Sequence, residues 1–487
     1  MKDFSEYLEA TGEVGTVEEV LPSIVYVAGL PTCRPYEVVM FESGEIGQII
    51  SMNSKYVEVL LLSRASIKGG TRVTRTDRKM EVLVSDSILG RVVDPLGKTI
   101  IGSPMPRVKA EPRPLFITPG GIGERRNISE PLETGVCIVD LTVPLGKGQR
   151  ELVVGDRKSG KTLFLQQAVL SHALKGGICI YASIAKRWSD TQTTLAFFKK
   201  FGVDNKVVMV VAGPADTPGL IFLAPYTALT YAEYFRDKGH DVLLILDDMT
   251  THAKYYREIT LSARRFPGRG SYPGDIFYVH SRILERAGKF AKGSISCLPV
   301  AETTFRDFSG YIQTNLMSMT DGHIFFDGDL FTRGRRPAVN TFLSVTRVGL
   351  QTQTNLVREI NRELSKFLVV YEKLRQYMHF GSELSQETKR TLSVGERITS
   401  FFEQAGDSII PLNINLLLLG GIWAGLWRDK EIPEMKKEMY QKVDIYIRDS
   451  GYRSMVDKFI AGTETFAELI FNLKEDESIL FGKGGRK

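Results

Sequence analysis

The chain has 487 residues, of which 43% are hydrophobic and 25% charged, a composition typical of soluble globular proteins. The net charge of +6 is small for 63 basic and 57 acidic residues, and basic clusters such as 199–200, 264–265 and 333–336 are short and scattered, which argues against nucleic-acid binding. A chain of this length exceeds one core, so we expect about two to four domains.

The cysteines and the apolar segments exclude further classes of protein. The four cysteines, Cys33, Cys137, Cys179 and Cys297, are isolated and form no C-x-x-C pair, which argues against a zinc site. We expect them to be small core residues of a protein from a reducing compartment. Residues 1–10 carry acids and no apolar core, unlike a signal peptide. Residues 412–427 contain two asparagines and fall short of the roughly 20 apolar residues of a membrane span, which favours a buried helix.

The first region, residues 1–91, reads as short strands separated by turns with Gly, Pro and Asp. We expect strands at 24–28, 37–41, 57–62 and 71–75. Their spacing predicts a small β-barrel or sandwich, preceded by only about ten residues. A connector rich in Pro and Gly follows at 94–131 and shows no periodicity, which indicates a linker along the surface.

Residues 92–350 form the second predicted domain, in which apolar runs alternate with amphipathic stretches after about residue 135. This alternation predicts a mostly parallel sheet with helices on its faces, and the strands are expected at 151–154, 178–184, 207–212, 242–246 and 294–300.

Residues 351–487 form the third predicted domain, a helical bundle that ends in a disordered Gly/Lys tail. Apolar residues recur three and four positions apart. We expect helices at 355–378, 391–402, 414–427 and 435–447.

The strongest chemical signal is a complete G-x-x-x-x-G-K-[ST] motif at residues 155–162. It follows the predicted strand 151–154 and opens the helical stretch 163–174, so backbone N–H groups and a helix N-terminus converge on phosphate oxygens. Lys161 is expected to reach the terminal phosphates and Thr162 to ligate Mg²⁺. The predicted nucleotide-binding residues are Gly155, Asp156, Arg157, Lys158, Ser159, Gly160, Lys161 and Thr162.

The predicted strand 242–246 ends in two acids, Asp247 and Asp248. An acid at this place in P-loop proteins holds the magnesium, which makes Asp247 the second predicted Mg²⁺ ligand. Such a residue can instead be an N-cap carboxylate for the next helix, and we leave this alternative open for both acids. For Asp248, capping and a metal role are equally favoured.

Longer runs resemble a known family, the head subunits of rotary ATPases. The runs are 90–97 (GRVVDPLG), 144–151 (PLGKGQRE), 273–278 (PGDIFY), 280–286 (HSRILER) and 320–324 (TDGHI). Finer marks are similar to the alpha subunits of F-type ATP synthases: 155–157 (GDR), 224–226 (APY), 234–236 (YFR) and 344–349 (SVTRVG). The resemblance covers the chain from about residue 11 and thins after about residue 430.

This resemblance implies a β-barrel, a central RecA-like P-loop domain and a helical bundle. It also implies a hexamer in which alpha and beta subunits alternate around a gamma shaft, held by a delta or peripheral stalk on an ion-translocating membrane sector. Such an alpha subunit binds ATP or ADP with Mg²⁺ without hydrolysis, at the cytoplasmic, matrix or stromal face of the membrane. Arg347 matches the arginine that completes the neighbouring catalytic site, although an arginine in this place can also be half of a surface ion pair.

The residues after the predicted strand 178–184 favour the non-catalytic role. Hydrolysing relatives carry there a glutamate that activates water, whereas this chain has Ala185, Lys186 and Arg187 and no acid before Asp190. Alpha subunits typically have glutamine at the position of Ala185. The alternative function is a self-sufficient homohexameric P-loop NTPase, such as a secretion ATPase or an RNA helicase, which needs both the glutamate and the arginine in one chain.

Two departures from the family leave details open. Lys158 stands where alpha subunits usually have glutamine. Its positive charge either tightens nucleotide binding, or its side chain points into solvent and has no effect on binding. The short segment before the barrel leaves the attachment to the peripheral stalk undecided.

Overall fold

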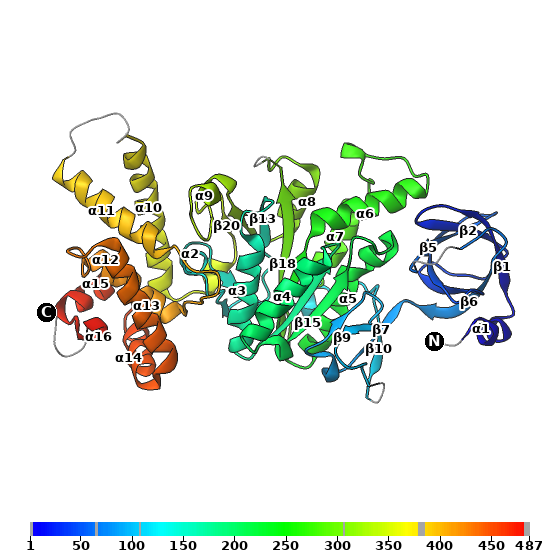
Figure 1. Cartoon of the computed structure of the whole chain (residues 1–487), viewed down its shortest axis with the longest axis horizontal. Helices are drawn as coiled ribbons and strands as arrows, with labels where there is room; N and C mark the ends of the chain where they lie inside the picture. The colour runs from blue at the N-terminus through cyan, green and yellow to red at the C-terminus, as the bar shows by residue number, and fades with distance from the viewer. Residues whose placement is uncertain (1–2, 64–66, 107–108, 305–306, 378–384, 482–487) are drawn as a thin grey trace. The chain divides into compact units, whose positions relative to one another are not determined.

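The computed structural model describes residues 3–63, 67–106, 109–304, 307–377 and 385–481. Backbone contacts divide the chain into two compact units. Unit 1 comprises residues 1–127, 148–154 and 173–321, and unit 2 comprises residues 128–147, 155–172 and 322–487. The expected fold class is confirmed: a closed barrel, a mixed sheet with helices and a set of C-terminal helices (Figure 1). The predicted domain boundaries at 91/92 and 350/351 stay predictions.

The N-terminal part of unit 1 is a closed β-barrel with the strand order β1-β2-β5-β4-β3-β6 (Figure 1, blue). Its strands are β1 (Val14–Val20), β2 (Ile24–Ala28), β3 (Glu37–Phe41), β4 (Ile46–Met52), β5 (Val57–Leu61) and β6 (Arg72–Lys79). The short segment before them forms helix α1 (Phe4–Thr11), which contacts β6. Alternate β-branched side chains point inward, and Val25, Val39 and Val59 are fully buried.

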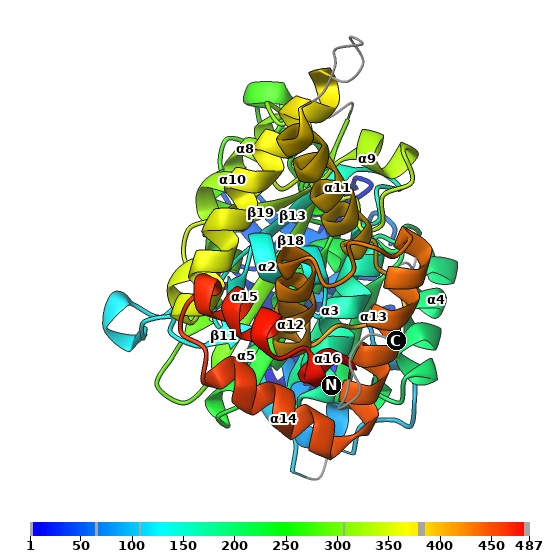
Figure 2. The same ribbon diagram turned by 90° about the vertical axis from the view of Figure 1, so that its left-hand side faces the viewer.

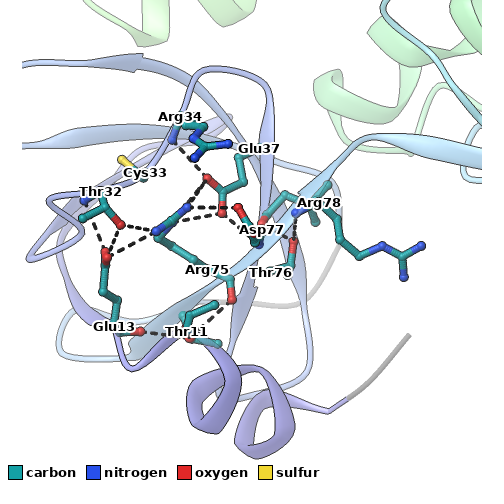
Figure 3. A network of polar contacts seen from close by, with 12 residues as sticks. Thr11, Glu13, Thr32, Cys33, Arg34, Glu37, Arg75, Thr76, Asp77 and Arg78 are labelled. Carbon is teal, nitrogen blue, oxygen red and sulfur yellow. Dashed lines mark hydrogen bonds and ion pairs between the residues drawn. The ribbon is translucent and has the colours of Figure 1, made fainter.

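A buried ion-pair network ties the strands of the barrel together (Figure 3). The Arg75 guanidinium of β6 lies 3.0 Å from a Glu37 carboxylate oxygen of β3 and 3.2 Å from a Glu13 oxygen, and it also contacts Thr32. The side chains of Arg75 and Glu37 are only 8% and 4% exposed. Since an unpaired buried charge is costly, each member of this network depends on the others.

The central sheet of unit 1 has the order β13-β18-β16-β14-β15-β8-β9. Its strands are β8 (Val92–Val93), β9 (Thr99–Ile101), β13 (Leu152–Asp156), β14 (Ile178–Ile184), β15 (Val207–Ala212), β16 (Asp241–Asp247) and β18 (Ser294–Thr303). Strands β14, β15, β16 and β18 are parallel, as predicted, and the register places Ser183 beside Asp247. The carboxyl ends of parallel strands therefore share one edge, the usual place of a ligand site in such sheets.

Helices and one small strand complete unit 1. The helices are α4 (Trp188–Lys200), α5 (Pro218–Asp237), α6 (Met249–Ser262), α7 (Ile276–Leu284) and α8 (Tyr311–Met319), and β17 (Gly288–Lys289) pairs with β18. Helix α5, which contacts β14, β15 and β16, is almost wholly apolar and buried. The buried Arg286 forms a two-point ion pair with Glu233 of α5, at 2.7 and 2.9 Å, as expected for a core ion pair.

The connector 94–131 is more ordered than a surface linker. Within it, β9 joins the edge of the central sheet and β10 (Glu111–Pro114) pairs with β7 (Glu81–Val84). Short 3₁₀ turns lie at Asp86–Ile88 and Ile122–Glu124. The sequence predicted a surface linker without periodicity and did not predict these short strands, because edge pairing is made by backbone groups and requires no apolar periodicity.

Unit 2 contains the predicted helical bundle (Figures 1 and 2). Its C-terminal helices are α10 (Asn355–Tyr377), α11 (Gln386–Phe401), α12 (Leu412–Ala424), α13 (Ile432–Arg448), α14 (Ser450–Ala461), α15 (Phe466–Glu475) and α16 (Ser478–Phe481). The expected apolar helix is α12, which contacts α14 and α15 and is buried from Ile414 to Ile422. Met378 and the predicted tail lie outside the described residues. Among the described helices, none is long and apolar enough to cross a membrane.

Unit 2 also contains the P-loop helix α3 (Lys161–Leu174) and several short elements. They are α2 (Cys137–Thr142), α9 (Gly328–Thr332), the 3₁₀ turn Gly349–Thr352 and the pairs β11 (Pro131–Leu132) with β12 (Leu145–Gly146) and β19 (Gly322–Phe326) with β20 (Val345–Thr346). All four cysteines of the chain are free and buried, as predicted.

Candidate nucleotide site

The motif 155–162 lies between β13 and α3, which is the strand–loop–helix context that the sequence predicts. Gly155 and Gly160 have φ angles of 157° and 95°. A Cβ atom on Gly155 would lie 2.3 Å from the Phe326 carbonyl oxygen, so only glycine fits there. The loop is therefore closely packed against β19, which holds its backbone in place.

Lys161 is 8% exposed and closes the loop from inside. Its ammonium donates to the carbonyl oxygens of Gly155 at 2.8 Å and Asp156 at 2.6 Å, and the Ser159 hydroxyl donates to Asp156 at 2.8 Å. These contacts hold a cation at the amino end of α3, where the helix dipole also attracts anions. Arg157, Lys158 and Thr162 are exposed.

An aromatic residue that the sequence did not single out lies beside this loop. A Cβ atom on Gly160 would lie 3.7 Å from the ring of Phe331, which belongs to α9. The Arg336 guanidinium stacks over the same ring, 3.4 Å from its centre, and donates to the Phe331 carbonyl oxygen at 2.6 Å. The sequence placed Arg336 only in a short basic cluster, since no local pattern indicates which side chains reach the P-loop.

In unit 1, Ala185, Lys186 and Arg187 follow the end of β14 and include no acid. Ala185 has φ 52°, and its N–H donates to the Ala212 carbonyl oxygen at 2.7 Å. The chain turns there and directs Lys186 across the sheet edge. The Lys186 ammonium lies 2.9 Å from Asp247 Oδ1 and 3.0 Å from Asp248 Oδ2.

Asp247 and Asp248 are 4% and 1% exposed, and their surroundings differ. Tyr181 donates to Asp247 Oδ2 at 2.9 Å, so both oxygens of Asp247 have protein partners. Asp248 caps α6 by accepting the Thr251 N–H at 2.6 Å, which confirms the capping alternative for Asp248. Burial lowers the pKa of Lys186, but the two carboxylates outweigh it and raise that pKa, so Lys186 stays cationic.

The described residues contain no group of three His, Cys, Asp or Glu side chains able to enclose a metal ion by themselves. A magnesium ion needs no such group, since it binds through a hydroxyl or a carboxylate, phosphates and water. The exposed Thr162 hydroxyl fits this role directly. Asp247 fits it through water, because its two oxygens are already engaged.

Arg347 lies in unit 2 directly after β20 and is exposed. The loop that carries it is fixed at both sides of the arginine. The Thr346 hydroxyl donates to the Pro144 carbonyl oxygen at 3.1 Å, and a Cβ atom on Gly349 would lie 1.7 Å from that oxygen. In the described parts of the chain the Arg347 guanidinium has no hydrogen-bond or ion-pair partner.

Comparison with known proteins gives consistent matches over nearly the whole chain. Residues 135–346 match the ATP synthase alpha/beta family, nucleotide-binding domain, and residues 353–470 match the ATP synthase alpha/beta chain, C terminal domain. The chain is 37% identical over 457 residues to ATP synthase subunit alpha of Clostridium acetobutylicum, covering 92% of this chain and 90% of that protein.

Two further relatives are similar to the same extent. ATP synthase subunit alpha of Lactobacillus johnsonii is 36% identical over 91% of this chain and 89% of its own length. That of Clostridium botulinum is 36% identical over 93% of this chain and 91% of its own length. The resemblance seen in the sequence motifs is confirmed, and the chain belongs to the ATP synthase alpha/beta family, where its relatives are alpha subunits.

Proposed function

We propose that this chain is the nucleotide-binding, non-catalytic alpha subunit of an F-type ATP synthase head. The ring contains three pairs of alternating alpha and beta subunits around a gamma shaft, joined through a delta or peripheral stalk to a membrane sector that moves ions. This assembly places the chain peripherally on the cytoplasmic face of the coupling membrane, or on the matrix or stromal face in an organelle.

The nucleotide is ATP or ADP, with Mg²⁺, and the P-loop residues 155–162 hold its phosphates. The Lys161 ammonium and the N–H groups at the start of α3 bind the phosphate oxygens, since they combine charge with fixed direction. Thr162 and Asp247 orient the magnesium, which neutralises phosphate charge when bound. The stacked pair of Phe331 and Arg336 supports a planar base near the same loop.

The observation that carries the non-catalytic assignment is the cation at the end of β14. A water molecule is activated for attack by a carboxylate that accepts its proton. At residues 185–187 this chain has no carboxylate, and the ammonium of Lys186 is bound to Asp247 and Asp248. Neither Ala185 nor a cationic Lys186 can accept a proton, so bound ATP persists.

Arg347, which is exposed and has no partner among the residues that the structure describes, supports the second half of the proposal. A guanidinium placed at a neighbour's phosphoryl group offsets charge that develops during transfer, and such an arginine contributes about 10³–10⁵ in rate. A fixed loop and a free side chain are what this role requires, because an arginine held by an internal acid is unavailable to another subunit. The self-sufficient homohexameric NTPase is disfavoured, since it requires an acid after β14.

The test is to purify the full chain and to measure ATP binding and ATP hydrolysis on the same sample. We expect one nucleotide per chain, retained in Mg²⁺, with negligible turnover, and assembly with a beta-type partner in equal numbers as judged by mass. Brisk hydrolysis by the chain alone would contradict the proposal and favour the homohexameric NTPase.

A further inference from the structure

Two arginines of the segment after α9 line a cavity in unit 2 that the proposed function does not use. The cavity has a volume of about 300 Å³ and lies between this segment and helices α10 and α11. This volume is at the lower end of the range of about 300–1,000 Å³ seen for small-molecule sites. Its wall has an apolar part, which includes Leu330, Phe342, Leu368 and Phe402, and a cationic part formed by Arg333, Arg335 and Arg375.

The charges in this wall do not balance. Of the two acids that line the cavity, Glu403 is held by Lys436 at 2.9 Å and Glu372 lies 3.6 Å from Arg375. Within the described residues, Arg335 has no ion-pair partner and its side chain makes no hydrogen bond. Burial and the nearby Arg375 together lower the pKa of Arg335, which shows that the protein itself does not compensate its charge fully.

A tyrosine hydroxyl group lies in the same wall. Tyr371 of α10 lines the cavity, is 4% exposed and makes no hydrogen bond with any described residue. Its ring is fixed, because a Cβ atom on Gly395 of α11 would lie only 2.0 Å from a ring carbon. A ring fixed in this way places the Tyr371 hydroxyl at the cavity wall, where it can donate a hydrogen bond to a ligand oxygen.

We propose that this cavity binds a small organic anion, in which an apolar body carries one carboxylate or phosphate group. The oxyanion accepts hydrogen bonds from the Arg335 guanidinium and the Tyr371 hydroxyl, and the apolar body packs against Phe342, Leu368 and Phe402. A guanidinium is suited to this task, because its planar fork matches two oxygens of one group. The apolar wall selects against inorganic anions, which leave that surface wet.

The test uses the full chain with Lys161→Ala, so that the P-loop does not contribute to anion binding. Isothermal titration compares 2-naphthoate with 2-naphthalenemethanol, which has the same rings without the charge, and with inorganic phosphate, which has the charge without the rings. We expect 2-naphthoate to bind at least about tenfold more tightly than either, because only 2-naphthoate contacts both the apolar part and the cationic part of the wall.

Variants then locate the site. Arg335→Gln and Tyr371→Phe should each weaken 2-naphthoate binding, the former by about tenfold or more, while the chain keeps its circular dichroism spectrum. Arg362→Gln is the matched control. Arg362 lies on α10, as Tyr371 does, but its side chain is 63% exposed and pairs with Glu363. Tyr371→Phe removes only one oxygen, so it still tests the site if Arg335→Gln fails to fold.

Several results would overturn the proposal: no detectable binding of 2-naphthoate, equal binding of its neutral analogue, binding of phosphate as tight as that of 2-naphthoate, or equal losses in the Arg362→Gln control. If the affinity for 2-naphthoate is unchanged in both single variants, Tyr371→Phe and Arg335→Gln, the ligand binds elsewhere and the proposal is equally contradicted.

Discussion

Lys186, which follows β14, and Asp247, which ends β16, form a direct ion pair at 2.9 Å at the carboxyl edge of the central sheet. The pair extends to Asp248, 3.0 Å from the same ammonium. Two carboxylates that are adjacent in the chain and buried repel one another. The lysine therefore stabilises this edge of the sheet, because its charge offsets their repulsion.

Lys186→Met should destabilise the chain, because it leaves two buried carboxylates without their cation. We expect a loss of about 2–4 kcal/mol in the free energy of unfolding, less than the full cost of breaking a buried pair because Lys186 keeps some exposure. Urea-induced unfolding followed by circular dichroism measures it. Lys254→Met, at an exposed position on α6, is the control and should change stability by less than about 0.5 kcal/mol. Equal effects of the two variants would contradict a structural role for Lys186.

Arg347→Ala should abolish cooperative ATP turnover in a reconstituted alpha–beta ring and leave ATP binding to this chain intact. The expected loss is about 10³-fold or more, because a fixed charge at the transferring phosphoryl group disappears. Arg347→Lys keeps the charge but not the planar fork and should recover only part of the rate. Turnover assays at saturating ATP, with binding measured separately, check this prediction. Unchanged turnover in Arg347→Ala would exclude the role.

Lys161→Ala should weaken ATP retention by this chain by about tenfold to a hundredfold, since a charge-assisted contact to phosphate contributes about 1.5–3 kcal/mol. Turnover of the assembled ring should fall only in part, because the catalytic sites belong to the neighbours. Equilibrium dialysis and ring ATPase assays measure the two effects. Complete loss of turnover would indicate that this P-loop is itself catalytic.

Lys158→Gln distinguishes the two hypotheses about how the exposed Lys158 of the P-loop affects ATP binding. If the charge of Lys158 tightens binding, the variant loses affinity for ATP in the same dialysis experiment. If the side chain remains in solvent, the affinity is unchanged within error and Lys158→Gln becomes the matched control for Lys161→Ala.

Arg75→Met should destabilise the barrel by about 3–5 kcal/mol, because the removal of one partner leaves Glu37 charged and buried. Arg72 of the same strand provides the control, since its ion pair with Glu42 is 58% and 36% exposed. Arg72→Met should cost no more than about 1 kcal/mol. Chemical unfolding of both variants measures the difference, and similar losses would show that the buried network of Figure 3 adds nothing to stability.

Two buried histidines make the stability of unit 1 depend on pH. His252 Nε2 lies 3.1 Å from the Phe222 carbonyl oxygen, and only a protonated nitrogen can donate to it. His252 Nδ1 is then an acceptor, so that His280 Nε2, 3.2 Å away, carries the proton between them. His280 Nδ1 has no partner in the described structure.

Burial lowers the pKa of His252 to about 4 and that of His280 well below its usual value. Between about pH 6.5 and pH 4 these histidines bind protons in the unfolded chain but not in the folded chain. The free energy of unfolding therefore has its full value above about pH 6.5 and decreases as the pH falls toward 4. The decline is at most about 1.4 kcal/mol per pH unit for each histidine. Unfolding measured between pH 7.5 and 4.5 tests it. His280→Leu should flatten the dependence and His240→Gln should not; an equally steep dependence in His280→Leu would contradict this origin.

Local patterns predicted most of the elements because their signals are local. The strands 24–28, 37–41, 178–184 and 207–212 were predicted to the residue, since each is an apolar run bounded by turn residues. Helix α1 and the short strands of the connector were not predicted. Their residues are polar or form edge pairs, and such segments carry no periodic apolar pattern.

The sequence by itself determined the family, the fold class, the P-loop and the missing acid after β14, because each depends on residue identity and spacing along the chain. Only the tertiary structure decided that Lys186 binds Asp247 and that Phe331 lies beside the P-loop with Arg336 stacked on its ring. It also decided that Arg347 has no partner among the described residues. These contacts join residues far apart in sequence, and their geometry is set by the packing of strands and helices, which no local pattern records.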